Sequence, residues 1–264
     1  MEKHISVTDV NKVFRTPDRE VVALKDINLD INKGEFVCLL GPSGCGKSTL
    51  LNAMAGFSLP SGGEIRVDGK KIIAPGPDRG MVFQEYALFP WMSVAQNISF
   101  GLEVQGMDKK AIGEKVDQLL DTLHLSDFRE RFPKDLSGGM RQRVAIARVL
   151  AIDSPIMLMD EPFGALDALT RRNLQDELLR IWKAFGKTIV FVTHSIEESI
   201  YLADRIVVMT YRPGTIKRDE RVSIARPRDP ASAEFNELKR ELGRLVMEEQ
   251  QRHAADEMLL ATVD

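Results

Sequence analysis

The segment at positions 41–49 combines residue types that bind a polyphosphate. It consists of Gly41, Pro42, Ser43, Gly44, Cys45, Gly46, Lys47, Ser48 and Thr49. Glycines let backbone N–H groups turn inward around an anion, where a Cβ atom would collide. Lys47 supplies a cation for the β- and γ-phosphates, and the Ser48 hydroxyl is a hard oxygen ligand suited to Mg²⁺. We predict a nucleotide phosphate loop over residues 41–48, and a simple glycine-rich turn is the alternative.

Two adjacent carboxylates end a short apolar run later in the chain. Residues 156–159 read Ile-Met-Leu-Met, and Asp160 and Glu161 follow directly. Ligand sites in open α/β sheets lie at the carboxyl ends of strands, so this pair is expected to face the phosphate loop. Asp160 would hold Mg²⁺ directly or through water, and Glu161 would orient and polarise an attacking water. The alternative is a strand that ends in two solvated acids.

The elements that must position these residues follow a parallel α/β pattern. The run from Glu35 to Leu40 is typical of a strand covered on both faces, and a helical pattern covers residues 47–55. A helix at about 168–185 would form a parallel βαβ unit with the strands on either side of it. The further short strands that we expect lie at 156–159, 189–192 and 206–209.

Other segments surround this core. Short alternating runs at 5–7, 21–24 and 27–31 predict antiparallel strands. An amphipathic helix is predicted over 108–131, from the helical spacing of Ile112, Val116, Leu119, Leu120 and Leu123. A further helix is expected after Ser137, so residues 86–152 form a predicted helical lobe.

The chain becomes helical again after residue 230. Phe235, Leu238, Leu242 and Leu245 step by 3, 4 and 3, with charged residues between them. This pattern predicts a terminal helix packed on its own core, and a helix that binds a partner is the alternative. We therefore expect one main domain over residues 1–230 and a C-terminal helical extension over 231–264.

Composition and charge exclude several classes of protein. Of the 264 residues 44% are hydrophobic, which is enough for a core and excludes global disorder. The net charge of -3 argues against a dedicated nucleic-acid binder. The longest apolar run, residues 36–40, is far shorter than the roughly 20 residues of a membrane-spanning helix. Residues 1–14 are polar, so we expect no secretory signal.

The two cysteines, Cys38 and Cys45, have no metal-ligand spacing. Their pattern favours a reducing, cytosolic compartment. Cys45 fills a free position of the phosphate loop, and a thiol so near the phosphates would make activity sensitive to alkylation.

A third motif joins the phosphate loop and the carboxylate pair. Residues 136–143, here called the signature segment, read Leu-Ser-Gly-Gly-Met-Arg-Gln-Arg, and Ser137 is a good N-cap residue. With Gln84, the Ala-Leu-Asp of 165–167 and His194, this segment resembles the ATP-binding-cassette (ABC) ATPases over about residues 5–215. The resemblance implies an α/β fold, a P-loop NTPase core with an antiparallel β lobe, an inserted α-helical lobe and a C-terminal helical extension.

The resemblance implies roles in binding and hydrolysing Mg-ATP. Gln84 is similar to the glutamine that contacts Mg²⁺ and the attacking water in this family. His194 is similar to the switch histidine that contacts the γ-phosphate, and Phe14 to the aromatic residue that stacks on adenine.

The resemblance also implies that two ATPase subunits meet at the nucleotide. Ser137, Gly138 and Gly139 resemble the loop that closes over the ATP held by the opposite subunit. Asp167 is similar to the family's aspartate at the dimer seam. The sequence departs from the family's usual pattern at Met140, where glutamine is more common.

Softer similarities indicate the branch of the family. The segments 86–94, 97–102 and 209–214 resemble the nitrate/sulfonate/taurine importer group. This resemblance implies an ATP-hydrolysing subunit that energises the uptake of a small anion, at the cytoplasmic face of the inner membrane. The partners it implies are a second ATPase subunit, which would make a homodimer, integral membrane permease subunits and, indirectly, an external substrate-binding protein. It implies no nucleic acid.

Several alternatives stay open at this point. Leu88, Phe89 and Trp91 would form the socket for a membrane subunit, or would pack within the helical lobe. A non-transport ABC ATPase that acts with soluble partners would share every nucleotide motif. A P-loop GTPase is disfavoured because the segments 11–14 and 32–35 both lack the aspartate of the guanine-reading motif.

Overall fold

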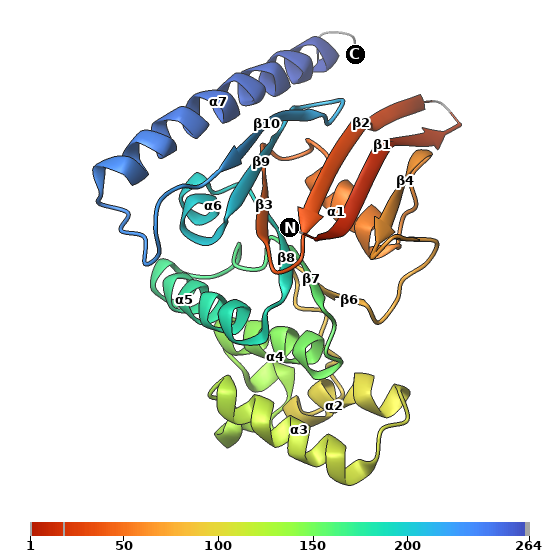
Figure 1. The fold of residues 1–264 in the computed structure, drawn as a ribbon, viewed down its shortest axis with the longest axis vertical. Helices are drawn as coiled ribbons and strands as arrows, with labels where there is room; N and C mark the ends of the chain where they lie inside the picture. The colour runs from red at the N-terminus through yellow and green to blue at the C-terminus, as the bar shows by residue number, and fades with distance from the viewer. Residues whose placement is uncertain (1, 18, 262–264) are drawn as a thin grey trace. The chain divides into compact units, whose positions relative to one another are not determined.

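The computed structural model describes residues 2–17 and 19–261 (Figure 1). The chain divides into two compact units. The first unit comprises 1–75 and 188–264, and the second unit comprises 76–187. The C-terminal helix thus belongs to the same unit as the phosphate loop, and the helical lobe belongs to the other.

The first unit contains an antiparallel sheet. Its strands are β1 (Lys3–Thr16), β2 (Arg19–Asn32), β4 (Gly62–Val67) and β5 (Lys70–Lys71), in the order β2-β1-β4-β5. Antiparallel pairing is confirmed, but the separation of 21–24 from 27–31 is wrong, because both runs lie in β2. The left-handed backbone of Asp26, with φ 49°, interrupts the alternation between them without ending the strand.

The first unit also holds parallel strands that carry the phosphate loop. The strand β3 (Phe36–Leu40), whose five residues are all buried, pairs in parallel with β8 (Thr188–Thr193) and β9 (Arg205–Met209). Leu40 lies opposite both Thr193 and Val208, so the carboxyl ends of these strands share one edge. β10 (Ile216–Arg221) adds an antiparallel edge to β9.

Three helices accompany these strands, α1 (Lys47–Ala55), α6 (Ile196–Leu202) and α7 (Ala233–Ala261). α7 packs on α6 and β9, so the prediction of a terminal helix on its own core is confirmed (Figure 1). Its fully covered positions are Phe235, Leu242, Val246 and Glu249, whereas Leu238 and Leu245 are half-buried. These covered positions are seven, four and three residues apart, which is the spacing of residues on one face of a helix.

The second unit places two parallel strands beside a set of helices. The strands are β6 (Arg79–Val82) and β7 (Ile156–Asp160), and Val82 lies opposite Met159. The helices are α2 (Val94–Val104), α3 (Lys109–Thr122), α4 (Gly138–Ala151) and α5 (Ala168–Phe185), with short 3₁₀ turns at Ser126–Phe128 and Pro133–Asp135. The predicted helix at 168–185 is confirmed.

The predicted helix over 108–131 is wrong at its C-terminal end, since α3 stops at Thr122. His124 adopts a left-handed backbone with φ 54°. Its N–H bonds to the Asp121 carbonyl at 3.1 Å, and the Leu125 N–H bonds to the Leu120 carbonyl at 2.7 Å. These two bonds form a Schellman cap, which satisfies the last carbonyls of the helix and turns the chain away.

A buried amide organises the start of the helical lobe. Asn97 on α2 is fully buried. Its Nδ2 donates to the carbonyls of Phe89, Met92 and Ser93 at 3.0–3.1 Å, and its Oδ1 accepts from the Phe89 N–H at 2.9 Å. One side chain therefore fixes the irregular segment 89–93 onto α2.

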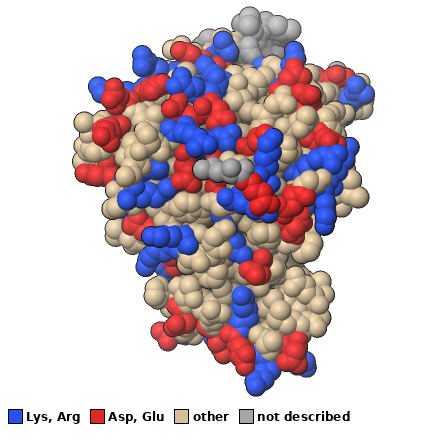
Figure 2. Space-filling view, viewed as in Figure 1, with Lys and Arg blue, Asp and Glu red and all other residues tan. Residues whose placement is uncertain are grey.

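The surface carries charges of both signs. Lys and Arg lie among Asp and Glu over the face seen in Figure 2, with no large area of a single sign. Among the helices of the described residues, none has the length and apolar composition needed to span a membrane.

We expect Asn97→Ala to lower the free energy of unfolding by about 2–4 kcal/mol, because buried polar groups left without partners cost about 1–3 kcal/mol each. Urea denaturation followed by circular dichroism measures the change. Gln118→Ala, at an exposed position of α3, is the matched control and should leave stability within about 0.5 kcal/mol. Equal stability of the Asn97 variant and wild type would contradict the role of this amide.

Candidate functional site

The phosphate loop, residues 41–48, joins β3 to α1 in the first unit. Gly46 has a left-handed backbone with φ 97°, and a methyl group there would lie 2.7 Å from Leu24 Cδ2 and 3.0 Å from the Ala23 carbonyl oxygen. Only glycine fits this conformation and this space. Lys47 is 4% exposed, and its Nζ donates to the carbonyls of Gly41 and Pro42 at 2.8 Å each. The predicted loop lies between a strand, β3, and a helix, α1, which is the context that phosphate binding requires.

The N-terminus of α1 favours an anion. Its N-cap residue, Gly46, supplies no side-chain hydrogen bond, and no acidic residue lies in the first turn, which contains Ser48 and Thr49. The first N–H groups of a helix have no partner within it and lie at the positive end of the helix dipole. Ser43, Gly44 and Ser48 are exposed. This helix end can therefore bind a phosphate group.

Tyr211 lies beside the phosphate loop, although it is far from the loop in sequence. A methyl group on Gly44 would lie 3.7 Å from Cε2 of Tyr211. Tyr211 is not among the residues that the motifs predict at this site, because segment 209–214 carries no nucleotide motif and its local signal is the turn-forming Pro213-Gly214.

Cys45 is buried in the loop, and so is Cys38 in β3. Burial raises the pKa of the Cys45 thiol, although the Lys47 ammonium acts in the opposite direction. Burial also raises the pKa of the Cys38 thiol well above its ordinary value. Because the thiolate is the reactive form, the expected sensitivity to alkylation does not fit this geometry.

His194 follows β8 at the edge where Gly41 follows β3, and its side chain is exposed. Thr193 Oγ1 donates to Glu198 at 2.5 Å and accepts from the Ser195 N–H at 3.0 Å. Ser195 caps α6 by accepting from the Glu198 N–H at 3.3 Å. The backbone on both sides of His194 is thus fixed, and the histidine is presented on the same edge as the phosphate loop.

In the second unit, Asp160, Glu161 and Gln84 meet at the carboxyl edge of β6 and β7. Asp160 ends β7, and Gln84 follows β6 by two residues. A methyl group on Gly164 would lie 3.9 Å from Gln84 Nε2 and 3.9 Å from Glu161 Oε2. The predicted amide and carboxylate therefore both lie beside Gly164.

Glu161 has an unusual backbone, with φ 41°. A residue with a side chain costs about 1–3 kcal/mol in a sparsely populated backbone conformation, and such residues cluster at functional sites. The following turn fixes this conformation, since the Gly164 N–H donates to the Glu161 carbonyl at 3.1 Å.

The signature segment forms the N-terminus of α4. Ser137 is exposed and caps the helix, accepting from the Met140 N–H at 3.3 Å. The structure adds a packing reason for the glycines, because a methyl group on Gly139 would lie 2.7 Å from Thr170 Cγ2, and one on Gly138 would lie 3.0 Å from Leu166 Cδ2. The two glycines let α4 approach the start of α5 closely.

Asp167 is the N-cap of α5, which begins beside those glycines. Its carboxylate accepts from the N–H groups of Thr170 and Leu169 at 3.0 and 3.1 Å. The bond from the Thr170 backbone is the main cause of the lowered pKa of Asp167. Asp167 caps α5 within its own chain, so this role needs no second subunit, and it is compatible with the predicted place of Asp167 at a dimer seam.

Phe14 lies on β1 and is 45% exposed, so a flat ring is available to a ligand. The Lys12 ammonium lies 5.2 Å from the centre of that ring. Lys12 therefore makes a cation–π interaction with the Phe14 ring.

Leu88, Phe89 and Trp91 were expected to be exposed together as a socket, and the structure corrects this expectation for two of them. Trp91 is 69% exposed, but Leu88 and Phe89 are half-buried. The Phe89 ring lies 4.7 Å from the Phe100 ring, 5.7 Å from the Trp91 ring and 4.6 Å from the Arg148 guanidinium. Packing within the helical lobe thus accounts for two of the three residues, and Trp91 alone projects.

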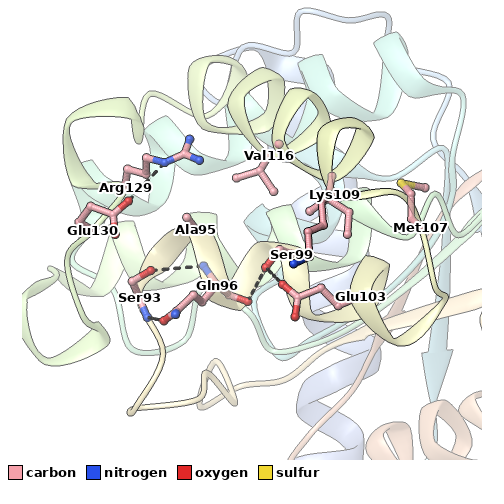
Figure 3. A pocket seen from close by; sticks show the side chains of 12 residues that line it. Ser93, Ala95, Gln96, Ser99, Glu103, Met107, Lys109, Val116, Arg129 and Glu130 are labelled. Atoms are coloured by element: carbon pink, nitrogen blue, oxygen red, sulfur yellow. Dashed lines mark hydrogen bonds and ion pairs between the residues drawn. The ribbon is translucent and has the colours of Figure 1, made fainter.

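A groove of about 660 Å³ lies between α2 and α3 in the second unit. Its lining mixes apolar groups such as Val116 with polar ones, and a hydrogen bond of 2.6 Å joins Ser99 to Glu103 in its wall (Figure 3). None of the residues predicted to bind nucleotide lines it.

A glycine-rich loop between a parallel strand and a helix, in a chain with two acids at the end of another parallel strand, defines a P-loop nucleotide-binding ATPase. The chain belongs to the ABC transporter family, whose family model matches residues 24–164. The resemblance inferred from the motifs is confirmed, as are the α/β fold class and the ATPase activity that the family implies.

Relatives resemble the chain over nearly its full length. The nitrate import ATP-binding protein of Synechocystis sp. is 47% identical over 90% of this chain and 90% of its own length. The taurine import ATP-binding protein of Roseobacter denitrificans is 49% identical over 84% of this chain and 83% of its own length. A solved dimeric ATP-binding cassette in a post-hydrolysis state, bound to ADP and Pi, is 33% identical with a TM-score of 0.74, and the match covers 84% of this chain and 100% of that chain.

We expect the native protein to react slowly with 5,5′-dithiobis(2-nitrobenzoic acid), because both thiols are buried and their pKa values are raised. Absorbance at neutral pH should show no fast-reacting thiol, and both cysteines should react once the chain is denatured. A fast reaction of one thiol in the native protein would contradict the burial of Cys45.

Proposed function

We propose that the protein is the ATP-hydrolysing subunit of an importer for a small anion such as nitrate, taurine or another sulfonate. Similarity to nitrate and taurine import ATP-binding proteins over more than four fifths of the chain supports this function. The observation that carries it is the complete set of ATP motifs, at strand ends and helix N-termini, within a chain so similar to import subunits.

ATP binds through the phosphate loop in this proposal. The N–H groups of residues 43–49 and the Lys47 ammonium hold the β- and γ-phosphates at the positive end of α1. Lys47 reaches the nucleotide by exchanging its bonds to the Gly41 and Pro42 carbonyls for bonds to phosphate oxygens. Phe14 stacks on the adenine ring.

The residues proposed for Mg²⁺ fit that ion. The described residues hold no group of three or more His, Cys, Asp or Glu side chains that could bind a metal alone. Mg²⁺ is usually bound through one or two carboxylates together with nucleotide phosphates, so a single acid suffices. Ser48, Asp160 and Gln84 supply hard oxygen atoms for it. When bound, Mg²⁺ neutralises charge on the β- and γ-phosphates.

Hydrolysis needs a water in line with the γ-phosphorus atom. Glu161 accepts a hydrogen bond from that water and orients its oxygen for attack. As the bond from this oxygen to the γ-phosphorus forms, the bond from phosphorus to the bridging oxygen breaks, the proton of the water passes to Glu161, and ADP and phosphate remain. Gln84, whose amide converges with Glu161, helps to position the water. His194 donates to the γ-phosphate and stabilises the charge that develops there.

Two copies of the chain sandwich the nucleotides in this proposal. The signature segment of each copy, through Ser137, Gly138 and Gly139, covers the ATP held by the other, with Asp167 at the seam. The dimeric solved cassettes support this arrangement, and a two-fold pair presents the same surface from both copies. ATP then acts as the link between the copies, and hydrolysis releases it.

The pair works at the cytoplasmic face of the inner membrane, bound to integral permease subunits. An external substrate-binding protein delivers the anion to the permease. Trp91, exposed on the segment that Asn97 fixes, is the contact that we propose for the permease. The ATPase does not touch the transported anion, so the permease and binding protein select it.

We expect a tagged copy, extracted from native membranes in mild detergent, to co-purify with a polytopic membrane protein identified by mass spectrometry. Trp91→Ala should weaken that association, because it removes a large exposed aromatic side chain from the contact. Val104→Ala, at an exposed apolar position of α2, is the matched control. Recovery of soluble partners alone would contradict the importer function and favour a non-transport ABC ATPase.

We expect Glu161→Gln to lower ATP turnover by about 10²–10⁴-fold, the usual contribution of a positioned acid–base group. Binding of ATP should persist, so the variant should accumulate as a dimer in size-exclusion chromatography with ATP. Glu114→Gln, at an exposed acid of α3, is the control and should turn over like wild type. Hydrolysis by the Glu161 variant at the wild-type rate would rule out its catalytic role.

A further inference from the structure

The turn that joins β9 to β10, residues 210–215, lies directly against the phosphate loop. A methyl group on Gly44 would lie 3.7 Å from Tyr211 Cε2 and 3.9 Å from Arg212 Nη2. A methyl group on Gly214 would lie 2.3 Å from the Cys45 carbonyl oxygen, so the two backbones touch with no space for a side chain. The turn therefore forms one wall of the phosphate loop.

The base of this turn is fixed by its own hydrogen bonds. Thr210 Oγ1 donates to the Pro213 carbonyl at 2.8 Å and accepts from the Thr215 N–H at 2.9 Å. The Gly214 N–H donates to the Ala23 carbonyl, and the Lys25 N–H donates to the Gly214 carbonyl, both at 3.0 Å. Tyr211 is held differently, by side chains of α7.

Two residues of α7 hold Tyr211. Glu249 Oε2 accepts from the Tyr211 N–H at 2.9 Å, and the His253 ring lies 4.3 Å from the Tyr211 ring. Glu249 is fully buried, and Lys217 Nζ donates to its other oxygen at 2.7 Å. Burial acts to raise the pKa of Glu249, but the bonds from Lys217 and the Tyr211 N–H outweigh it, so the pKa is lowered. Glu249 is thus a charged acceptor, which makes a stronger hydrogen bond.

Docking of α7 alone does not require this arrangement. Phe235, Leu242 and Val246 already supply an apolar face, and a buried charge carries a desolvation penalty of several kcal/mol that an apolar residue avoids. The buried carboxylate instead holds the backbone of one residue, Tyr211, whose ring lies beside Gly44 of the phosphate loop.

We propose that Glu249 is a positioning residue for the nucleotide site. Through Tyr211 it fixes the wall of the phosphate loop at Gly44, so that α7 sets the affinity of the loop for ATP. This inference rests on the proposed role of residues 41–48 in ATP binding. The C-terminal helix α7 would then contribute to nucleotide binding in addition to packing on α6 and β9.

The test uses isothermal titration calorimetry on the full chain. It measures the dissociation constant of the protein for the Mg²⁺ complex of AMP-PNP, a non-hydrolysable ATP analogue. Glu249→Ala should raise the constant by at least about fivefold, the lower end of typical coupling between sites. Glu248→Ala is the matched control, because Glu248 also bonds to Lys217, at 2.6 Å, but does not contact Tyr211. The control should bind like wild type.

A purely structural role gives a different result. Glu249→Ala would then lower the unfolding temperature without nucleotide and leave the dissociation constant within twofold of wild type, and that result would overturn the proposal. Equal losses in the Glu248 and Glu249 variants would overturn it as well. Glu249→Gln keeps an acceptor oxygen for the Tyr211 N–H and should restore most of the affinity.

Two further variants keep the test decisive. If Glu249→Ala fails to fold, His253→Ala removes the ring contact with Tyr211 and keeps the Glu249 carboxylate. It should raise the dissociation constant in the same direction, and wild-type affinity of this variant would overturn the proposal. Lys47→Ala should abolish binding in every background. Unchanged binding by the Lys47 variant would instead contradict the proposed role of the phosphate loop itself.

Discussion

A buried ammonium group holds the phosphate loop together from within. Lys47 lies at the start of α1, and its Nζ donates to the carbonyls of Gly41 and Pro42, which directly follow β3. A charged group can be buried only when it is hydrogen-bonded, so these contacts tie the end of the strand to the start of the helix. The rest of the first unit fixes the two joined elements. β8 and β9 bond to both sides of β3, Leu24 fills the space beside Gly46, and the turn after β9 supports Gly44 and Cys45.

In the second unit, strand register and backbone conformation place the proposed site residues. Parallel register between β6 and β7 sets Gln84 and Glu161 at the same edge of the strands, and both side chains lie beside Gly164. Glu161 has a left-handed backbone at this edge. Close approach at Gly139 and the cap at Asp167 then set α4 and α5, and with them the exposed hydroxyl of Ser137. Each of these residues is part of the scaffold as well as a proposed contact to ATP.

The placement of α7 extends this view to the C-terminus. A terminal helix could be anchored by apolar contacts alone, yet Glu249 is buried and charged, and it holds the backbone beside the phosphate loop. The family relationship accounts for the ATPase activity. It leaves the strength of nucleotide binding to be set by residues around the loop, and the contact from α7 through Tyr211 is one such influence.

Elements whose signals are local can be predicted from the sequence alone. The helix after the phosphate loop and α5 start and stop where predicted, because Gly46, Gly56, Asp167 and Gly186 are caps that neighbours in the chain specify. The ATP motifs were readable for the same reason, since each is a short run of residue types that its chemistry requires. Features that depend on contacts between distant segments are visible only in the folded protein. The end of α3 relies on a cap at His124, where no glycine signals the end of the helix. β2 continues past Asp26 because β1 pairs with it on both sides of a register shift. The burial of Cys45, the need for glycine opposite Thr170 and the bond from Glu249 to Tyr211 arise from packing between residues far apart in the chain, which no local pattern encodes.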